Sequence, residues 1–362
     1  MPGDIMLIGI GDLGNHILNF LARTPGISRI IAADFDDKAA LCKVATARYG
    51  ACFQGFYPEI DFLKLDLSDV EHVSDILRET RPSVICSTAV LHAGYLRPHL
   101  SKEVLDDIHA EYEGEACLNS LQLYCPLKLM QAVKRSGIDA QVINSSYPDL
   151  THPVLKGMGL APTCGGGNVA LATGFIREIV SDELAVATED VSILLVSHHS
   201  WFARADERIP YWVKILAGGV DVTAEFPPTK LCREIRRLYD KYPVGREGPL
   251  GESARYHQQW IASAFVQNIL AIYFDTGEIC HAPGPNGLPG GYPVRLSARG
   301  CEIYLPQEID LHEAIEINEQ AQRFDGIERI ESDGTIVRVD GSALKPQDIE
   351  QTALHLMSII RR

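Results

Sequence analysis

The stretch IMLIGIGDLG, residues 5–14, decides the fold of this chain. Its first four residues, Ile5 to Ile8, form an apolar run of the length of a buried strand. The glycine spacing Gly9-x-Gly11-x-x-Gly14 follows directly, and the pattern from Asn15 to Arg23 predicts a helix. Glycines at these positions permit a tight turn between a strand and a helix. We therefore expect a strand–turn–helix unit at the start of the chain.

The same turn predicts a bound dinucleotide. The helix N-terminus, where Asp12 and Leu13 stand beside the glycines, would hold a pyrophosphate on its free amide groups. A second predicted strand, Arg29 to Ala33, leads into Asp34, twenty residues past Gly14. The Asp34 carboxylate would accept hydrogen bonds from a ribose diol and repel a 2′-phosphate, which favours NAD over NADP. The alternative is that the glycines serve the turn alone.

Short apolar runs alternate with helical patterns from this unit to about residue 145, which is typical of a doubly wound parallel sheet. Further strands are expected at 62–65, 83–87 and 141–144. Ser68 and Glu71 predict a capping box for a helix through Arg78, and residues 101–136 read as one long or broken helix. The fold class is therefore α/β, with an N-terminal Rossmann domain over 1–150.

The pattern changes after residue 150, which predicts a second, α+β domain over 151–362 that carries substrate. A helix is expected at 169–184 and a strand at 191–196, and 281–293 is rich enough in Gly and Pro to predict an irregular loop. Further predicted elements are helices near 206–217, 228–240 and 251–274, a strand near 300–305, a short helix, a hairpin around Asp333-Gly334 and a terminal helix from Pro346.

Composition excludes several classes of protein. The chain has 362 residues with 33 basic and 48 acidic side chains, a net charge of −15 that argues against nucleic-acid and anionic-membrane partners. Nine scattered cysteines, none in a CxxC pair, favour a reducing cytosol over a disulfide scaffold. The N-terminus lacks the basic start of a signal peptide, and no apolar run approaches the roughly 20 residues of a membrane span. We expect a cytoplasmic protein with a small-molecule substrate.

Polar residues at predicted strand ends are the candidates for chemistry. His198 and His199 follow the strand at 191–196, where a histidine can act as acid or base, although a hydrogen-bonded loop histidine is the alternative. Asn144 ends the fifth strand and either contacts the ligand or forms a turn before Pro148. Further cofactor candidates are Thr88 and Ala89, which follow the fourth strand. The loop 92–102 carries Arg97 and Lys102, which either close over a substrate or are solvated charges.

These stretches together resemble the lactate/malate dehydrogenase superfamily over most of the chain. The resemblance is carried by GIGDLG with Asp34, by TAVLHAGYLRPHLSKEVL, QVINSSYPD, GGGNVALATGFIREIVSDEL, DVSILLVSHHS and GYPVRLSARGCEIYLP. It implies that His198 transfers the proton and that Asn144 contacts the nicotinamide ribose and the reacting oxygen. It places Lys102 at the family's mobile-loop arginine and Leu96 or Arg97 at its specificity arginine. It also implies a homodimer or homotetramer.

The departures from the family pattern bear on the substrate. The family's helix aspartate, which orients the histidine, falls on Ala172, and its substrate-clamping arginine falls on Phe175. Because an arginine–carboxylate fork supplies orientation as well as energy, its loss disfavours pyruvate or oxaloacetate. An apolar Phe175 would favour a neutral or differently shaped substrate. His199, Ser197 or another group would have to orient His198, with His199 also expected to touch the substrate.

Three functions remain open from the sequence. The first is an NAD-dependent oxidoreductase that acts on a non-standard hydroxy or keto compound, for example in a specialised biosynthetic step. The second is an NAD- and metal-dependent hydrolase or lyase like the family-4 glycosidases, with Cys164 and His198 as the metal ligands, although a lone Cys and His are weak evidence for a metal. The third is an NAD-binding protein without catalysis.

Overall fold

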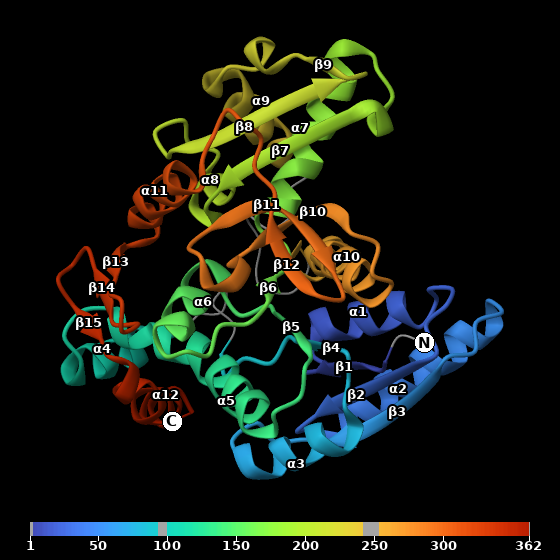
Figure 1. Ribbon diagram of the computed structural model, residues 1–362. Coiled ribbons are helices and arrows are strands. Elements are labelled where there is room, and N and C mark those ends of the chain that lie inside the picture. Colours follow the sequence, from blue (N-terminus) through green and yellow to red (C-terminus); the bar gives the residue numbers. More distant parts are fainter. Residues whose placement is uncertain (1–2, 93–99, 242–252, 362) are drawn as a thin grey trace.

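The computed structural model describes residues 3–92, 100–241 and 253–361, and its first half is built on a six-stranded parallel sheet (Figure 1). The strand order is β3-β2-β1-β4-β5-β6. Strands β2 and β3 are added on one side of β1 and strands β4 to β6 on the other, as a doubly wound sheet requires. The strands are β1 (Ile5–Ile8), β2 (Arg29–Asp34), β3 (Glu59–Lys64), β4 (Val84–Ser87), β5 (Gln141–Asn144) and β6 (Cys164–Gly165). The predicted Rossmann arrangement is thus confirmed.

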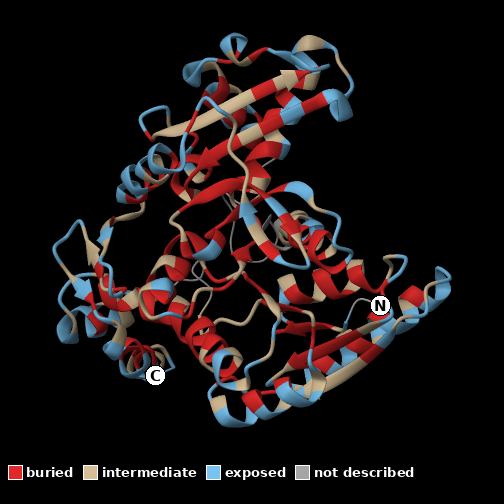
Figure 2. Cartoon of the chain, viewed as in Figure 1, coloured by how far each residue is buried: buried red, intermediate tan, exposed pale blue. Residues whose placement is uncertain are grey.

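Both faces of this sheet are covered, which explains the apolar character of β1. Ile5 and Leu7 pack on one face with α1 (Asp12–Leu21) and α2 (Asp37–Phe53). Met6 and Ile8 pack on the other face with α3 (Val70–Thr80) and α5 (Ser120–Ser136). Because every residue of β1 is buried, the strand has no polar face, as expected of a central parallel strand (Figure 2).

The start of α3 differs from the prediction. Asp69, rather than Ser68, caps α3, because its carboxylate accepts a hydrogen bond from the amide of His72 at 3.0 Å. The stretch 101–136, predicted as one long or broken helix, is broken into α4 (Lys102–Glu111), the 3₁₀ helix η2 (Ala116–Asn119) and α5. Gly114 lies at the break with a positive φ of 65°, where an α-helix cannot continue. The sequence analysis missed α2, α6 (Pro148–Gly157) and β6.

The second half contains an antiparallel sheet of order β10-β11-β7-β8-β9, with β12 (Gly300–Ile303) beside β11. Its centre is β7 (Val191–Ser197), which pairs along its length with β8 (Tyr211–Ala217). The expected helix at 206–217 is therefore wrong, since aromatic and β-branched residues there pair as a strand. The edge strand β9 (Val220–Asp221) follows β8.

The expected irregular loop at 281–293 begins and ends in strands. β10 (Glu278–Pro283) and β11 (Gly291–Ser297) pair in register from Glu278 with Leu296 to Pro283 with Gly291. Most of the glycines and prolines lie in the connection, where the amide of Gly284 donates to the carbonyl of Gly290 at 2.7 Å, but Pro283, Gly291 and Pro293 belong to the strands. Composition thus identified the turn but not the strands on either side of it.

Helices of the second half surround this sheet and reach the first one. They are α7 (Val169–Leu184), α8 (His199–Arg204), α9 (Pro228–Lys241), α10 (Ser253–Tyr273) and α11 (Leu311–Gln322). Phe265 and Ile269 of α10 are buried in the same core as Ile17 of α1. Helix α10 therefore belongs to the core that the two halves share.

The chain then returns to the first half. After η6 (Arg323–Asp325), the strands β13 (Ile327–Ile330), β14 (Ile336–Arg338) and β15 (Ala343–Leu344) form a small sheet, and α12 (Ile349–Ile360) packs on α4 and α5 (Figure 1). Lys128 of α5 pairs with Glu350 of α12 at 2.6 Å. The division at residue 150 stays a prediction, and this C-terminal return segment, residues 323–361, connects the two halves.

Among the residues that the structure describes, no helix combines the length and the apolar character that a membrane span needs.

Substitution of the second and third glycines of the first turn should distinguish a glycine required for packing from one that leaves space for a ligand. A Cβ on Gly14 would stand 2.0 Å from the carbonyl oxygen of Gly9, whereas a Cβ on Gly11 meets nothing within 4 Å. We expect Gly14→Ala to lower the free energy of unfolding by about 3 kcal/mol and Gly11→Ala to change it by less than about 1 kcal/mol. Chemical denaturation measures both, and an equal loss in the two variants would contradict the packing argument.

Candidate functional site

The glycine turn is held open for a ligand by contacts with β2 and β4. Gly9 has a positive φ of 87°, its amide donates to the Ala33 carbonyl at 2.8 Å, and its own carbonyl accepts from Thr88 Oγ1 at 2.6 Å. A Cβ on Gly9 would stand 2.8 Å from the amide nitrogen of Ala89. Thr88 and Ala89, predicted cofactor residues, therefore support the turn from the neighbouring strand end.

The N-terminus of α1 suits an anion. Gly11 is the N-cap residue, and because glycine has no side chain the first amides, including those of Asp12 and Leu13, receive no side-chain cap. The empty space beside Gly11 lets a phosphate approach these amides, where the helix dipole favours negative charge. The geometry of the turn fits the pyrophosphate predicted from the sequence.

Asp34 lies at the end of β2, beside this turn, and is partly exposed. Its carboxylate accepts from the amide of Ile10 at 2.5 Å and from the amide of Asp36 at 3.0 Å. The carbonyl of Ile10 accepts from Lys43 Nζ at 2.6 Å. A ribose diol would therefore share Asp34 with the turn itself, since a carboxylate has lone pairs for further donors.

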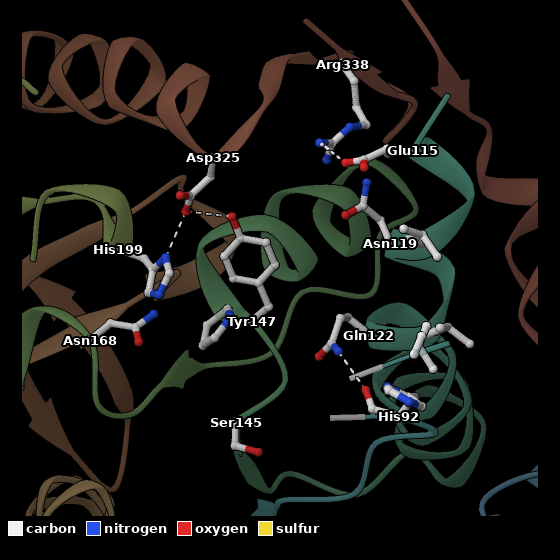
Figure 3. Close-up of a pocket in the computed structure, with 14 residues that line it drawn as sticks. His92, Glu115, Asn119, Gln122, Ser145, Tyr147, Asn168, His199, Asp325 and Arg338 are labelled. Carbon is white, nitrogen blue, oxygen red and sulfur yellow. Dashed lines mark hydrogen bonds and ion pairs between the residues drawn. The ribbon is translucent and has the colours of Figure 1, made fainter. Parts of the chain in front are cut away.

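A cavity of about 560 Å³ opens beyond the carboxyl end of β5 (Figure 3). Ser145, Tyr147 and Asn168 line one side of it together with His199 and Asp325. Parallel α/β sheets bind ligands at this edge, so the cavity lies where the sequence analysis expected the reacting group.

A histidine–aspartate pair stands at this side of the cavity. His199 Nδ1 lies 2.8 Å from Asp325 Oδ2, which also accepts from the Tyr147 hydroxyl at 2.9 Å. The other carboxylate oxygen, Oδ1, pairs with Arg204 at 2.8 Å. The Asp325 side chain is only 9% exposed. A buried carboxylate needs such partners, and His199, Tyr147 and Arg204 supply them.

The two groups shift each other's pKa in opposite directions. Burial lowers the pKa of His199, but the hydrogen bond and charge of Asp325 outweigh burial and raise the pKa above its ordinary value of 6.5. Burial raises the pKa of Asp325, but the hydrogen bond from His199 and the charges around it hold the pKa well below 3.8. Because Nδ1 is bound to Asp325, the opposite ring nitrogen, Nε2, is the one left to exchange a proton with a ligand.

His198, the predicted proton carrier, is placed elsewhere. Its side chain is 1% exposed, against 39% for His199, and its Nδ1 caps α8 by accepting from the amide of Ser200 at 3.1 Å. Burial lowers the pKa of His198, more strongly than the charges of Asp149 and Asp325 raise it. The turn into α8 thus buries His198 and presents His199 to the cavity.

The backbone around the pair is strained. Tyr147 has a φ of 41° and Asn168 a φ of 44°, a region that side chains other than glycine seldom occupy. Buried Asp149 holds both sides of this region, since it accepts from Asn168 Nδ2 at 2.5 Å and from the amide of His199 at 2.9 Å. Such strain persists only where surrounding contacts enforce it, and it gathers at functional sites.

Asn144 does not face the cavity. Its side chain is buried, with Nδ2 3.1 Å from His152 Nε2 and Oδ1 accepting from the amide of Ser146 at 3.2 Å. The contacts with nicotinamide and substrate predicted for Asn144 would require it to leave this network. Its neighbour Ser145 lines the cavity instead.

The other predicted substrate residues are also displaced or untested. Lys102 is exposed at the start of α4 and pairs with Asp106 at 2.5 Å. Phe175 packs with Phe202 and Trp260 in an aromatic cluster of the second half, at ring distances of 5.5 and 4.9 Å. Arg97 lies outside the described residues.

Sequence reasoning missed Asp325, Tyr147 and Asn168. Asp325 lies far along the chain in a segment that no motif marks, so no sequence signal pointed to it. Asn168 follows three glycines at 165–167, which was a detectable sign of a tight approach at that point.

The alternative metal ligands, Cys164 and His198, are both buried. Cys164 is fully buried in β6, with the thiols of Cys301, Cys280 and Cys86 among its neighbours, and its contact with Cys301 and its burial raise the pKa of the thiol. Within the described ranges, no group of three or more His, Cys, Asp or Glu side chains is arranged to hold a metal ion.

Comparison with known proteins bears on the fold. No protein-family model and no curated protein matches this sequence. Solved structures do, among them the malate dehydrogenase of Salinibacter ruber, at 21% identity and a TM-score of 0.58 over 89% of this chain and 95% of that one. The malate dehydrogenase of Picrophilus torridus matches at 16% identity and a TM-score of 0.61, over 100% of this chain and 99% of that one.

A lactate dehydrogenase of Cryptosporidium parvum, complexed with lactic acid and NAD, matches at 16% identity and a TM-score of 0.59, over 90% of this chain and 98% of that one. At these identities the likeness is one of fold. The chain has the fold of lactate and malate dehydrogenases, with the doubly wound N-terminal sheet and the α+β second half that the sequence predicted.

The His199–Asp325 pair generates a prediction for pH. Its histidine contribution to stability is complete below about pH 6.5 and is lost as the pH rises through the raised pKa of His199. Its aspartate contribution is present above about pH 3.8 and is lost as the pH falls through the lowered pKa of Asp325.

We expect Asp325→Asn to lower the pKa of His199, measured by NMR titration of the ring. Asp206→Asn, which removes a carboxylate paired with Arg208, is the control and should leave His199 unchanged. An unshifted His199 in Asp325→Asn would contradict the assigned cause.

Proposed function

We propose that this protein is an NAD-dependent oxidoreductase that moves hydride to or from a non-standard hydroxy or keto substrate. The observation that carries the proposal is the His199–Asp325 pair, which lines a cavity at the carboxyl edge of a sheet whose glycine turn fits a dinucleotide. The likeness to NAD-linked dehydrogenase structures supports it. The fold alone would be compatible with other activities.

His199 carries the proton in this proposal. In the direction of oxidation, the hydroxyl proton of the substrate passes to Nε2 while a hydride leaves the carbon that bears the hydroxyl, and a ketone remains. Reduction is the reverse. NAD, when bound, accepts or supplies that hydride. Asp325 orients the ring through Nδ1 and stabilises the imidazolium that forms, as the carboxylate of a hydrolase triad does. Tyr147 and Arg204 keep Asp325 in place.

The described cavity does not favour a small 2-oxo acid. Its described lining contains the arginine Arg338, whose guanidinium is already paired with Glu115 at 3.2 Å. A carboxylate anchored there would compete with Glu115 for the same donors. This supports a substrate other than pyruvate or oxaloacetate.

We also propose that the protein forms a homodimer or homotetramer. Large apolar side chains are exposed on and beside α2, which supports a protein contact there. They are Phe35, Leu41, Tyr49, Phe53 and Tyr57. We expect sedimentation to show more than one copy per particle, and Phe53→Ser with Tyr49→Ser to shift the protein toward the monomer. Leu311→Ser, which changes an exposed apolar residue of α11 in the second half, should not. A monomeric wild type at micromolar concentration would refute the proposal.

Replacement of the two adjacent histidines tests the proposed chemistry. We expect His199→Asn to lower NADH turnover by about 10²- to 10⁴-fold, because the proton carrier is lost. His198→Asn should retain most activity, because asparagine is also a good helix cap. Steady-state kinetics with a panel of carbonyl compounds measures both.

Calorimetric titration with NAD and NADP is the companion measurement, with Asp34→Ala as the variant that weakens binding. Tight NAD binding with no turnover on any compound would favour a non-catalytic NAD-binding protein. Loss of activity in His198→Asn but not in His199→Asn would contradict the assignment of the proton carrier.

A further inference from the structure

A second polar cluster, Glu115, Asn119 and Arg338, lines the cavity apart from the His199–Asp325 pair (Figure 3). Arg338 ends β14, and Glu115 and Asn119 flank and end η2. Arg338 Nη2 donates to Glu115 Oε2 at 3.2 Å, and the Arg338 side chain is only 13% exposed. Neither the glycine turn nor the histidine uses this cluster.

Asn119 indicates that the cluster binds a ligand. It is 8% exposed, and its Nδ2 finds no hydrogen-bond partner among the described residues. A buried amide left without a partner costs about 1 to 3 kcal/mol, so such groups are rare without a purpose. Figure 3 shows Asn119 beside the Glu115–Arg338 pair, with its amide nitrogen directed toward that pair. An acceptor atom on a ligand would satisfy it.

The charges of the cluster restrict what that ligand is. Arg338 and Glu115 neutralise each other, so a ligand carboxylate would gain from Arg338 but be repelled by Glu115. A hydroxyl group avoids this conflict, because it donates one hydrogen bond and accepts others. Two neighbouring hydroxyls can donate to Glu115 and accept from Arg338 and Asn119 without separating the ion pair.

We propose that Glu115, Asn119 and Arg338 form a subsite for vicinal hydroxyl groups, so that the substrate is a polyhydroxylated compound of the polyol or sugar class. This rests on the proposed function, in which a secondary alcohol or ketone carbon of that compound reacts beside His199. The volume of about 560 Å³ supports a substrate larger than a three- or four-carbon acid. Gln122 of the same wall is held in place, since its Nε2 donates to the His92 carbonyl at 2.8 Å and its Oε1 accepts from Ser146 Oγ at 3.0 Å.

Ligand-observed NMR on the full chain, with and without NAD, tests the subsite independently of turnover. The probes are myo-inositol, D-sorbitol and D-glucose, compared with L-lactate and L-malate. We expect saturation transfer to at least one polyhydroxylated probe, reduced at least fivefold in Glu115→Ala and in Asn119→Leu. Glu115→Gln keeps a hydrogen-bond acceptor and should retain more transfer than Glu115→Ala. Glu111→Ala, which removes a carboxylate paired with His355 outside the cavity, should match the wild type.

The outcomes separate the two proposals. Saturation transfer to lactate or malate but to none of the polyhydroxylated probes would overturn the subsite, as would transfer that is unchanged in both Glu115→Ala and Asn119→Leu. Polyol binding that depends on Glu115, without NADH formation or NAD binding, would support the subsite and refute the oxidoreductase. Thermal unfolding of each variant shows whether a loss of transfer reflects the contact or the fold, and Glu115→Gln decides the case if Glu115→Ala unfolds.

Discussion

The arrangement of the site depends on the contacts of the buried Asp325 carboxylate. It accepts from Tyr147, which follows β5 of the first half, and pairs with His199 and Arg204 of α8 in the second half. A carboxylate that is nine-tenths buried is stable only when such partners neutralise it. The position of His199, the strain at Tyr147 and the path of the C-terminal return segment are therefore linked through one side chain.

The return segment brings a carboxylate and an arginine to the cavity. After α11, η6 brings Asp325 to His199, and β14 brings Arg338 to Glu115 on the opposite wall. The sheet β13–β15 and helix α12 pack on α4, α5 and η2, so these two side chains are held by a core rather than by a free loop. Because Arg338 is paired with Glu115, the proposed subsite suits hydroxyl groups better than a carboxylate.

The fold was predictable where a local pattern and its tertiary surroundings agree. The strands Ile5–Ile8 and Gln141–Asn144 and the helix Val169–Leu184 were predicted with their observed bounds, because each combines an apolar run with clear flanking turns. β8 was mistaken for a helix because its apolar residues fit both periods, and only pairing with β7 decides between them. The hairpin of β10 and β11 was hidden because glycine and proline at its turn outweighed the short strands beside it.

The sequence by itself determined the doubly wound sheet and the glycine turn, because the turn needs glycine at Gly9 for its positive φ and at Gly14 for its contact with the Gly9 carbonyl. Both constraints act within a short segment, so the spacing of the glycines in the sequence is enough to predict them. The tertiary structure alone decided that His199 rather than His198 faces the cavity and that Asp325, 126 residues further on, is its partner. Such a pairing depends on where a distant segment packs, and no local spacing records it.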